Sequence, residues 1–277
     1  MTDGYAWETT GEQRAYPADR LGKPSRRRGL PFFIGRDAED TDVPRADAES
    51  AGVAATPESL KRKGMPVQDL VELLKNNPYP GRGIVVGKDT VYYFIMGRSV
   101  NSRNRIFAIE PDGIRTEAHD PALLEDPSLI IYHPVRTMGD ALVVTNGDQT
   151  DTIVEAGDFR AGCMQREYEP DAPNFTPRIS AIVNPDGSFE MSILKHADGD
   201  RCTREFFAYE GVDEGQGYFI STYQGDGNPL PTFAGEPILV ALPAPDELWA
   251  VLNDDNKVSL YANVGGEVTL YNKNLGD

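Results

Sequence analysis

Residues 178–195 read RISAIVNPDGSFEMSILK, two apolar runs joined by Asn184-Pro185-Asp186-Gly187. Ile, Val and Phe are prominent in both runs, and such residues suit the pleated surface of a β-sheet. Asn, Pro, Asp and Gly between two such runs are the composition of a tight turn. This stretch therefore predicts two neighbouring antiparallel strands.

Similar runs follow one another on both sides of this hairpin, from about residue 79 onward. They are GIVVG, TVYYFIMG, RIFAIEP, LIIY, ALVVTNG, REFFAYE, GYFISTY, ILVAL and VSLYANVGGEVTLYN, the last with a turn at Gly265-Gly266. Helical spacing is confined to short stretches within residues 56–77, 120–126, 154–167 and 244–253. Many hairpins with few helices predict an α+β fold with largely antiparallel sheet.

Residues 1–55 have no sustained helical or strand period and are rich in Pro, Gly, Asp and Arg. We expect an extended or disordered N-terminal arm over residues 1–55 and one folded domain over residues 56–277. The triplet at residues 26–28 is either a solvated charge run or part of a docking strap anchored by Phe32 and Phe33.

The net charge of −17 is unevenly distributed. Residues 1–63 hold 11 of the 27 Lys and Arg residues and 11 of the 44 Asp and Glu residues, so the rest of the chain carries the whole net charge. Such an acidic body is a poor partner for nucleic acid. The sequence also contains no apolar run long enough for a membrane span and no secretory h-region, which predicts a cytoplasmic protein.

The few cysteine and histidine residues show no metal-binding spacing. Cys163 and Cys202 form no CxxC pair, and His119, His133 and His196 are scattered along the chain. We therefore expect no metal site.

The segment GRSVNSRNR, residues 97–105, gathers three arginines and two asparagines within this acidic body. The planar guanidinium group suits phosphate because it donates two parallel hydrogen bonds. The segment therefore predicts a phosphate site, with a polar turn facing water as the alternative.

Three more segments join apolar strands to short polar side chains. They are TNGDQTDT at residues 145–152, EYEPDAPNFTPRI at 167–179 and STYQGDGNP at 221–229. Strand ends of this kind often meet ligands, and the prolines of the second segment fix an irregular backbone path. Taken singly, each is also explained as a turn, a rigid connector or a surface loop.

Taken together and in this order, these segments resemble the archaeal-type IMP cyclohydrolase family, including its bacterial members. The resemblance covers about residues 78–242, and VTNGDQTDTI followed by NFTPRI is its most specific part. It implies a four-layer αββα sandwich like that of the N-terminal-nucleophile hydrolases, without a processed terminal nucleophile.

The implied reaction is dehydrative closure of 5-formamidoimidazole-4-carboxamide ribonucleotide to IMP in purine biosynthesis, without a cofactor. The resemblance places Arg105, Tyr132 and Glu169 at the catalytic centre, with Glu169 in proton transfer and Tyr132 as a hydrogen-bond donor. Substrate binding is predicted for Arg98, Asn101, Arg103, Asn146, Asp148, Thr150, Arg178 and Tyr223.

Two departures from the archaeal pattern stand out. His133 occupies a position where asparagine is expected, and the stretch from Ile153 to Tyr168 is shorter, which predicts a smaller helical layer. The alternatives are a purine-nucleotide-binding module without catalysis and an amide hydrolase of the same fold. The expected partner is a small nucleotide, with no nucleic acid and no membrane, and a homo-oligomer is left open.

Overall fold

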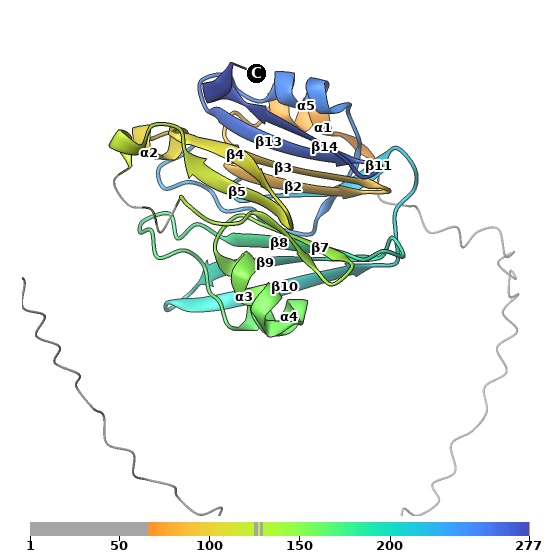
Figure 1. Ribbon diagram of the computed structural model, residues 1–277. Helices are drawn as coiled ribbons and strands as arrows, with labels where there is room; N and C mark the ends of the chain where they lie inside the picture. The colour runs from red at the N-terminus through yellow and green to blue at the C-terminus, as the bar shows by residue number, and fades with distance from the viewer. Residues whose placement is uncertain (1–65, 125–126, 128–129, 277) are drawn as a thin grey trace, which may run out of the picture. The chain divides into compact units, whose positions relative to one another are not determined.

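The structure is a computed structural model that describes residues 66–124, 127 and 130–276 (Figure 1). The predicted arm over residues 1–55 and the predicted start of the domain at Thr56 lie outside these residues. None of the helices in the described ranges combines the length and apolar character that a membrane crossing requires.

Two seven-stranded sheets contain most of the described chain. The first sheet has the strand order β1-β12-β11-β2-β3-β13-β14. Its strands are β1 (Gln68–Asp69), β2 (Arg82–Gly87), β3 (Thr90–Met96), β11 (Gln216–Ser221), β12 (Ile238–Ala241), β13 (Lys257–Val264) and β14 (Glu267–Asn272). All neighbours are antiparallel except β1 and β12.

The second sheet has the order β10-β9-β8-β7-β6-β5-β4 and is antiparallel throughout. Its strands are β4 (Arg105–Glu110), β5 (Gly113–Ala118), β6 (Val135–Met138), β7 (Ala141–Thr145), β8 (Arg178–Val183), β9 (Phe189–Ala197) and β10 (Arg201–Tyr209). The two sheets confirm the predicted largely antiparallel α+β architecture.

Both predicted hairpin turns are present. Residues 184–187 join β8 to β9, with Ile179 opposite Ile193 in the paired strands. Gly265 and Gly266 join β13 to β14 with φ angles of 61° and 87°. Two successive positive φ angles define the turn whose twist matches that of antiparallel strands, and glycine adopts them without steric cost.

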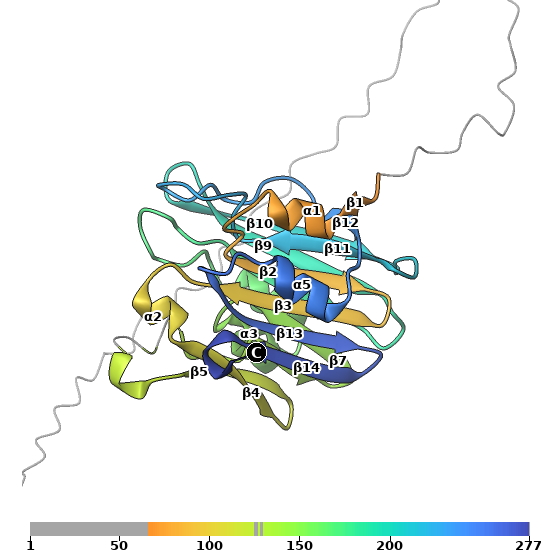
Figure 2. The ribbon, with the colours of Figure 1, turned by 90° about the horizontal axis from the view of Figure 1, so that it is seen from above.

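The two sheets face each other, and short helices cover their outer faces (Figures 1 and 2). The first sheet carries α1 (Leu70–Lys75) and α5 (Pro245–Val251), and the second carries α3 (Gln149–Ala156) and α4 (Phe159–Met164). Strand β3 is buried on both faces: Tyr93 packs between the sheets, whereas Phe94 packs toward α1 and α5. This double burial explains why its sequence is a continuous apolar run.

Some sequence-based expectations were wrong in detail. The described part of LIIY, residues 130–132, is not a strand, whereas β5 and β6 were missed because GIRTEA and VRTM are short and polar. Within the described residues the first helix begins only at Leu70, where Asp69 accepts hydrogen bonds from two backbone N–H groups of its first turn. Residues 120–126 contain only a short 3-10 helix at Pro121–Leu123.

Asn272 ties the two sheets together at the ends of β14 and β4. Its Oδ1 accepts hydrogen bonds from the Phe107 backbone N–H at 2.7 Å and from the Ser259 hydroxyl at 2.8 Å, and its Nδ2 donates to the Phe107 carbonyl at 3.2 Å. The side chain thus acts as a strand partner for Phe107 on an edge where β4 has none. Buried backbone groups need such partners.

We expect Asn272→Ala to lower the free energy of unfolding by about 2–4 kcal/mol, because Phe107 loses the partner of both its buried backbone groups. Urea unfolding followed by circular dichroism measures the change. Thr269→Ala on the exposed face of β14 is the control and should stay within about 0.5 kcal/mol of the wild type. Equal effects of the two substitutions would contradict a specific role for Asn272.

Candidate active site

A cavity of about 320 Å³ lies where several strands of both sheets begin or end. Tyr79 and Arg82 line it at the entrance to β2, and residues 98–102 line it after β3. Glu169 to Thr176 precede β8, and Tyr223 follows β11. The sandwich thus brings together four segments that are far apart in the sequence.

The arginine-rich segment forms one rim of this cavity. Ser99 caps the short helix α2 (Val100–Arg103) by accepting from the Ser102 backbone N–H, and the Ser99 backbone N–H donates to the Ser102 hydroxyl oxygen. Arg98 is 39% exposed; its guanidinium group lies 4.9 Å from the centre of the Tyr79 ring and 2.5 Å from Asp226. Asn101 has a buried Oδ1 with no hydrogen-bond partner among the described residues.

Arg105 is fully buried at the start of β4. Its Nε donates to the Ser102 carbonyl at 2.8 Å, while both terminal nitrogens have no hydrogen-bond partner in the described part of the chain. Burial lowers the pKa of Arg105, and the positive charge of Arg82 lowers it further. A buried guanidinium group with open donors favours an anionic or strongly polar ligand.

Arg82 is a second cation, partly buried at the start of β2, and sequence reasoning missed it. Burial alone would lower the pKa of Arg82, but the negative charge of Glu169 and neighbouring tyrosine oxygens raise it above the ordinary value. Its Nε is buried with no hydrogen-bond partner among the described residues. The available signal was weak: a single arginine between Gly81 and the apolar run GIVVG.

Glu169 is only 8% exposed and lines the cavity. Burial raises the pKa of its carboxyl group, and the charges of Arg82 and Arg178 oppose that shift without cancelling it. Its backbone N–H donates to the Thr176 carbonyl at 2.8 Å, and the Phe175 ring stacks on His196 at 4.4 Å. These contacts fix the backbone of the segment that carries Glu169, and its role at the site stays a prediction.

Tyr132 lies next to the cavity rather than on its wall. Its hydroxyl is 2.9 Å from that of Tyr93. Its backbone N–H donates to the Thr116 hydroxyl, and its carbonyl accepts from the Thr116 backbone N–H. Its hydroxyl contributes to the electrostatic environment of both Arg82 and Arg105. The unusual His133 contacts Asp151 at 3.0 Å and does not line the cavity.

Arg178 and Asp148 form an ion pair, and the positive charge of Arg178 acts on the nearby Glu169 carboxyl group. Arg178 donates to Asp148 at 2.8 Å and to Gln149 at 2.7 Å, and Asp148 also pairs with Arg166. A Cβ atom added at Gly147 would lie 2.6 Å from the Arg178 guanidinium and 3.6 Å from the Glu169 carboxyl. Glycine at this position therefore allows the backbone to approach these two side chains closely.

Five of the predicted substrate-binding residues do not line the cavity: Asp148 and Arg178, described above, and Arg103, Asn146 and Thr150. Asn146 and Thr150 are buried and hydrogen-bonded internally, Asn146 to the backbone of Pro177 and Ile179 and Thr150 to Thr145. Asn146 holds the end of β7 against the start of β8, and Thr150 joins α3 to the end of β7. The exposed Arg103 turns toward Gly97 and Asn256. The structure thus offers no contact between the side chains of Arg103, Asn146 and Thr150 and a ligand in the cavity.

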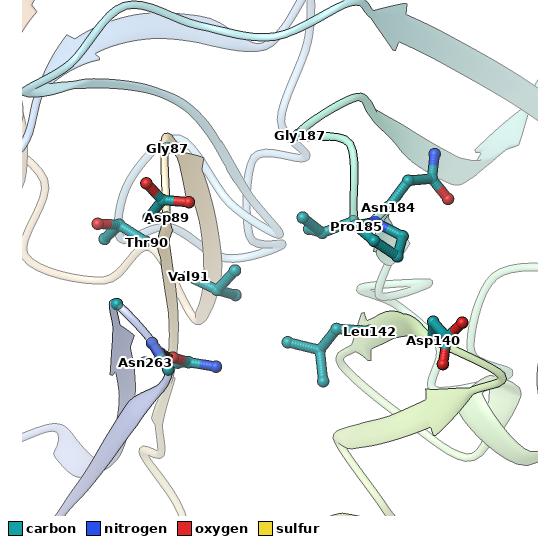
Figure 3. A pocket seen from close by; sticks show the side chains of 13 residues that line it. Gly87, Asp89, Thr90, Val91, Asp140, Leu142, Asn184, Pro185, Gly187 and Asn263 are labelled. Atoms are coloured by element: carbon teal, nitrogen blue, oxygen red, sulfur yellow. Dashed lines mark hydrogen bonds between the residues drawn. The ribbon is translucent and has the colours of Figure 1, made fainter.

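A second cavity, of about 460 Å³, lies at the opposite end of the β2–β3 hairpin. Figure 3 shows Asp89 and Asn263 on one side of it and Asp140 and Leu142 on the other. Among the described residues, no Lys, Arg or His lines it. Its carboxylates would repel an anionic ligand, so the smaller cavity, which Arg82 and Arg98 line, is the better candidate for a nucleotide site.

The fold and the cavity together define a protein of two facing β-sheets with a pocket lined by two arginine side chains, Arg82 and Arg98. Residues 79–267 match the family of IMP cyclohydrolase-like proteins. The match spans well over half of the sequence and includes every residue of the cavity. The chain belongs to this family.

Relatives in three archaea bear the name IMP cyclohydrolase. The protein of Methanosphaera stadtmanae is 32% identical over 165 residues, which are 53% of this chain and 74% of that protein. The protein of Methanococcus aeolicus is 26% identical over 166 residues, with the same coverage. That of Halobacterium salinarum is 30% identical over 125 residues, 42% of this chain and 63% of that protein.

Arg105 and Arg178 are expected to differ in their effect on stability. Arg105→Met should leave the free energy of unfolding unchanged or raise it by about 1–2 kcal/mol, because it removes a buried charge without a carboxylate partner. Arg178→Met should lower it by about 2–4 kcal/mol, because Asp148 and Gln149 lose their partner. Urea unfolding without ligand measures both. A loss in Arg105→Met as large as that in Arg178→Met would contradict this assignment.

The raised pKa of Glu169 predicts a pH-dependent effect on stability. A carboxyl group whose pKa is higher in the folded state stabilises the fold at low pH, and this contribution is lost as pH rises through the folded-state pKa. Glu169→Gln should therefore gain unfolding free energy relative to the wild type as pH rises from about 4.3, the ordinary value for glutamate. Urea unfolding at a series of pH values tests this, and a difference independent of pH would contradict it.

Proposed function

We propose that this protein is an IMP cyclohydrolase, which closes 5-formamidoimidazole-4-carboxamide ribonucleotide to IMP with loss of water. Family membership and the shared name of the archaeal relatives support the reaction. The observation that carries the proposal is the positive charge gathered around Glu169: the partly buried Arg82 and the fully buried Arg105 lie near this carboxyl group, and neither has a carboxylate within salt-bridge distance among the described residues. Such a site is suited to an anionic substrate.

The reaction requires the protein mainly to position the reacting groups of the substrate and to transfer protons. The carboxamide nitrogen and the formyl carbon belong to one molecule, so the protein must hold them in a reactive rotamer and stabilise charge on the formyl oxygen. A phosphate anchored elsewhere in the pocket supplies binding energy remote from the reacting atoms. Neither task requires a metal or an organic cofactor.

We assign the deep end of the cavity to the reacting groups. Glu169, whose pKa is raised by burial, is suited to giving a proton to the formyl oxygen. Arg105 and Tyr132 are buried beside it and are suited to stabilising negative charge on that oxygen. Arg82 belongs with them because its charge acts most strongly on Glu169.

The rim of the cavity is assigned to substrate binding. Arg98 is exposed enough to exchange its contact with Asp226 for a phosphate group, and Asn101 adds a polar side chain beside it. Tyr223 provides a wall against which a planar base can lie. Asp148 and Arg178 serve as the support for Glu169, and the internally bonded Asn146 and Thr150 are reassigned from ligand binding to the scaffold.

The remaining proposals concern fold relationship and setting. The order of helices, sheet, sheet and helices supports assignment to the αββα sandwiches of the N-terminal-nucleophile hydrolases. We also propose that the protein works in the cytoplasm on a small nucleotide. A homo-oligomer and a one-domain organisation over residues 56–277 stay predictions.

A single assay tests the function. Purified protein is incubated with the formamido ribonucleotide in the presence of a chelator, and IMP formation is followed by absorbance. Glu169→Gln is expected to lower turnover by roughly 10²-fold or more while the affinity for IMP stays within about threefold, because the isosteric amide keeps the cavity's shape but loses the transferable proton.

The alternatives predict different outcomes. A nucleotide-binding module would bind IMP without consuming the formamido substrate. An amide hydrolase would act on linear amides and depend on a Ser, Thr or Cys nucleophile. Full turnover by Glu169→Gln would remove this carboxyl group from the mechanism and leave the reaction itself established.

A further inference from the structure

A chain of three hydrogen-bonded side chains reaches the cavity wall and was not identified from the sequence. The Thr176 hydroxyl is 2.5 Å from Oδ2 of Asp171 and 2.5 Å from the Tyr223 hydroxyl. Asp171 also accepts the Thr176 backbone N–H through Oδ1 at 2.6 Å. All three side chains line the cavity, and Thr176 and Tyr223 are almost completely buried.

The direction of this chain follows from a count of hydrogen atoms. An ionised carboxylate only accepts hydrogen bonds, so the single hydroxyl hydrogen of Thr176 goes to Asp171. The Thr176 oxygen can then only accept from Tyr223, and the Tyr223 hydrogen points toward Thr176. The lone pairs of the Tyr223 oxygen are therefore the groups that this residue offers to the cavity.

The surroundings of Tyr223 keep its hydroxyl protonated and restrict the rotation of its ring. Burial raises the pKa of Tyr223 to about 12, so its hydroxyl carries a proton at neutral pH. The Tyr79 ring stacks against it at 5.9 Å, which restricts its rotation. Within the described residues the only hydrogen bond of the Tyr223 hydroxyl is the one to Thr176.

We propose that Tyr223, Thr176 and Asp171 form a proton relay that takes a proton from the attacking carboxamide nitrogen of the substrate. This inference rests on the proposed function and adds a second proton-transfer group to it. Glu169 and the relay then act on different atoms: Glu169 serves the formyl oxygen, and the relay serves the nitrogen. A concerted addition needs one group that gives a proton and one that accepts a proton.

The step balances as follows. The carboxamide nitrogen forms a bond to the formyl carbon, and the electron pair of the C=O π bond moves to the formyl oxygen, which takes the proton of Glu169. The nitrogen gives one proton to the Tyr223 oxygen, the Tyr223 proton moves to Thr176, and the Thr176 proton moves to Asp171. The product is the carbinolamine. Later loss of its hydroxyl as water, with the proton of the formamido nitrogen, gives IMP.

The acidity of the attacking nitrogen drives this transfer. An amide nitrogen that has gained a fourth bond is strongly acidic, so it readily gives its proton to the relay. In this proposal the Tyr223 hydroxyl, rather than the carboxylate, is the group placed against that nitrogen.

Asp171→Asn is the most informative variant because it keeps the shape of the side chain but reverses the direction of the hydrogen bonds along the relay. The remaining amide oxygen still accepts the Thr176 backbone N–H, while the new NH₂ group donates to the Thr176 hydroxyl. Thr176 must then donate to Tyr223, and the Tyr223 hydrogen turns into the cavity. A relay that accepted a proton becomes one that offers a proton.

We expect Asp171→Asn and Thr176→Val to lower the single-turnover rate constant roughly 30-fold or more, with IMP affinity within about threefold of the wild type. Thr176→Ser, which keeps the hydroxyl, should recover most of the rate lost in Thr176→Val. The double variant should be no slower than the slower single variant, because both act on one chain.

Asp186→Asn is the matched control. Asp186 accepts hydrogen bonds from the backbone N–H and the hydroxyl of Ser188, the same arrangement as Asp171 and Thr176, but in the β8–β9 turn far from this cavity. Its rate should equal that of the wild type. The rate measured in mixtures of light and heavy water gives a second readout: several protons in flight produce a curved dependence in the wild type and a linear one in Asp171→Asn.

Each outcome decides the proposal. IMP formation by the wild type together with undiminished rates in Asp171→Asn and Thr176→Val would overturn the relay and leave the proposed function intact. Equal losses in Thr176→Val and Thr176→Ser, or an unchanged heavy-water dependence in Asp171→Asn, would also overturn it. No IMP formation by the wild type would reject the proposed function itself.

Discussion

The structure depends on one electrostatic constraint: a fully buried guanidinium group, a partly buried one and a buried carboxyl group lie close together. Arg105 is removed from water, and Glu169 is the carboxylate whose charge acts most strongly on the partly buried Arg82. Buried charges are costly unless they are paired or hydrogen-bonded. The folded chain therefore maintains a site whose charges remain incompletely balanced until an anionic molecule enters it.

The two-sheet sandwich makes that constraint sustainable. Arg82 begins β2, Arg105 begins β4, and Glu169 precedes β8, so rigid strands fix the backbone at each charged residue. The core between the sheets and the ion pair of Arg178 with Asp148 hold the strands next to the cavity in place. Strain or misplaced charge at the site can be tolerated because the surrounding packing is extensive.

The residues proposed for catalysis differ in how far the sequence could predict them. Glu169 and Arg105 were predicted from the family resemblance, and their segments also carry local signals, prolines around Glu169 and an arginine cluster around Arg105. Arg82 gave almost no local signal, and Asp171 and Thr176 appear only as polar residues in a connector. Arg103 carries the same local signal as Arg98, yet its side chain bonds to Gly97 and Asn256 outside the cavity. Local composition does not specify the direction in which a side chain points.

The sequence by itself determined the antiparallel strands, their main hairpins and the family resemblance, because alternating or continuous apolar runs and turn residues act over a few neighbours. Only the tertiary structure decided which side chains share the cavity. That choice depends on the pairing of strands distant in sequence, which places Tyr223 beside Thr176 and Arg82 near Glu169. Hydrogen-bond direction and burial are likewise properties of the assembled neighbours, so no single segment encodes them.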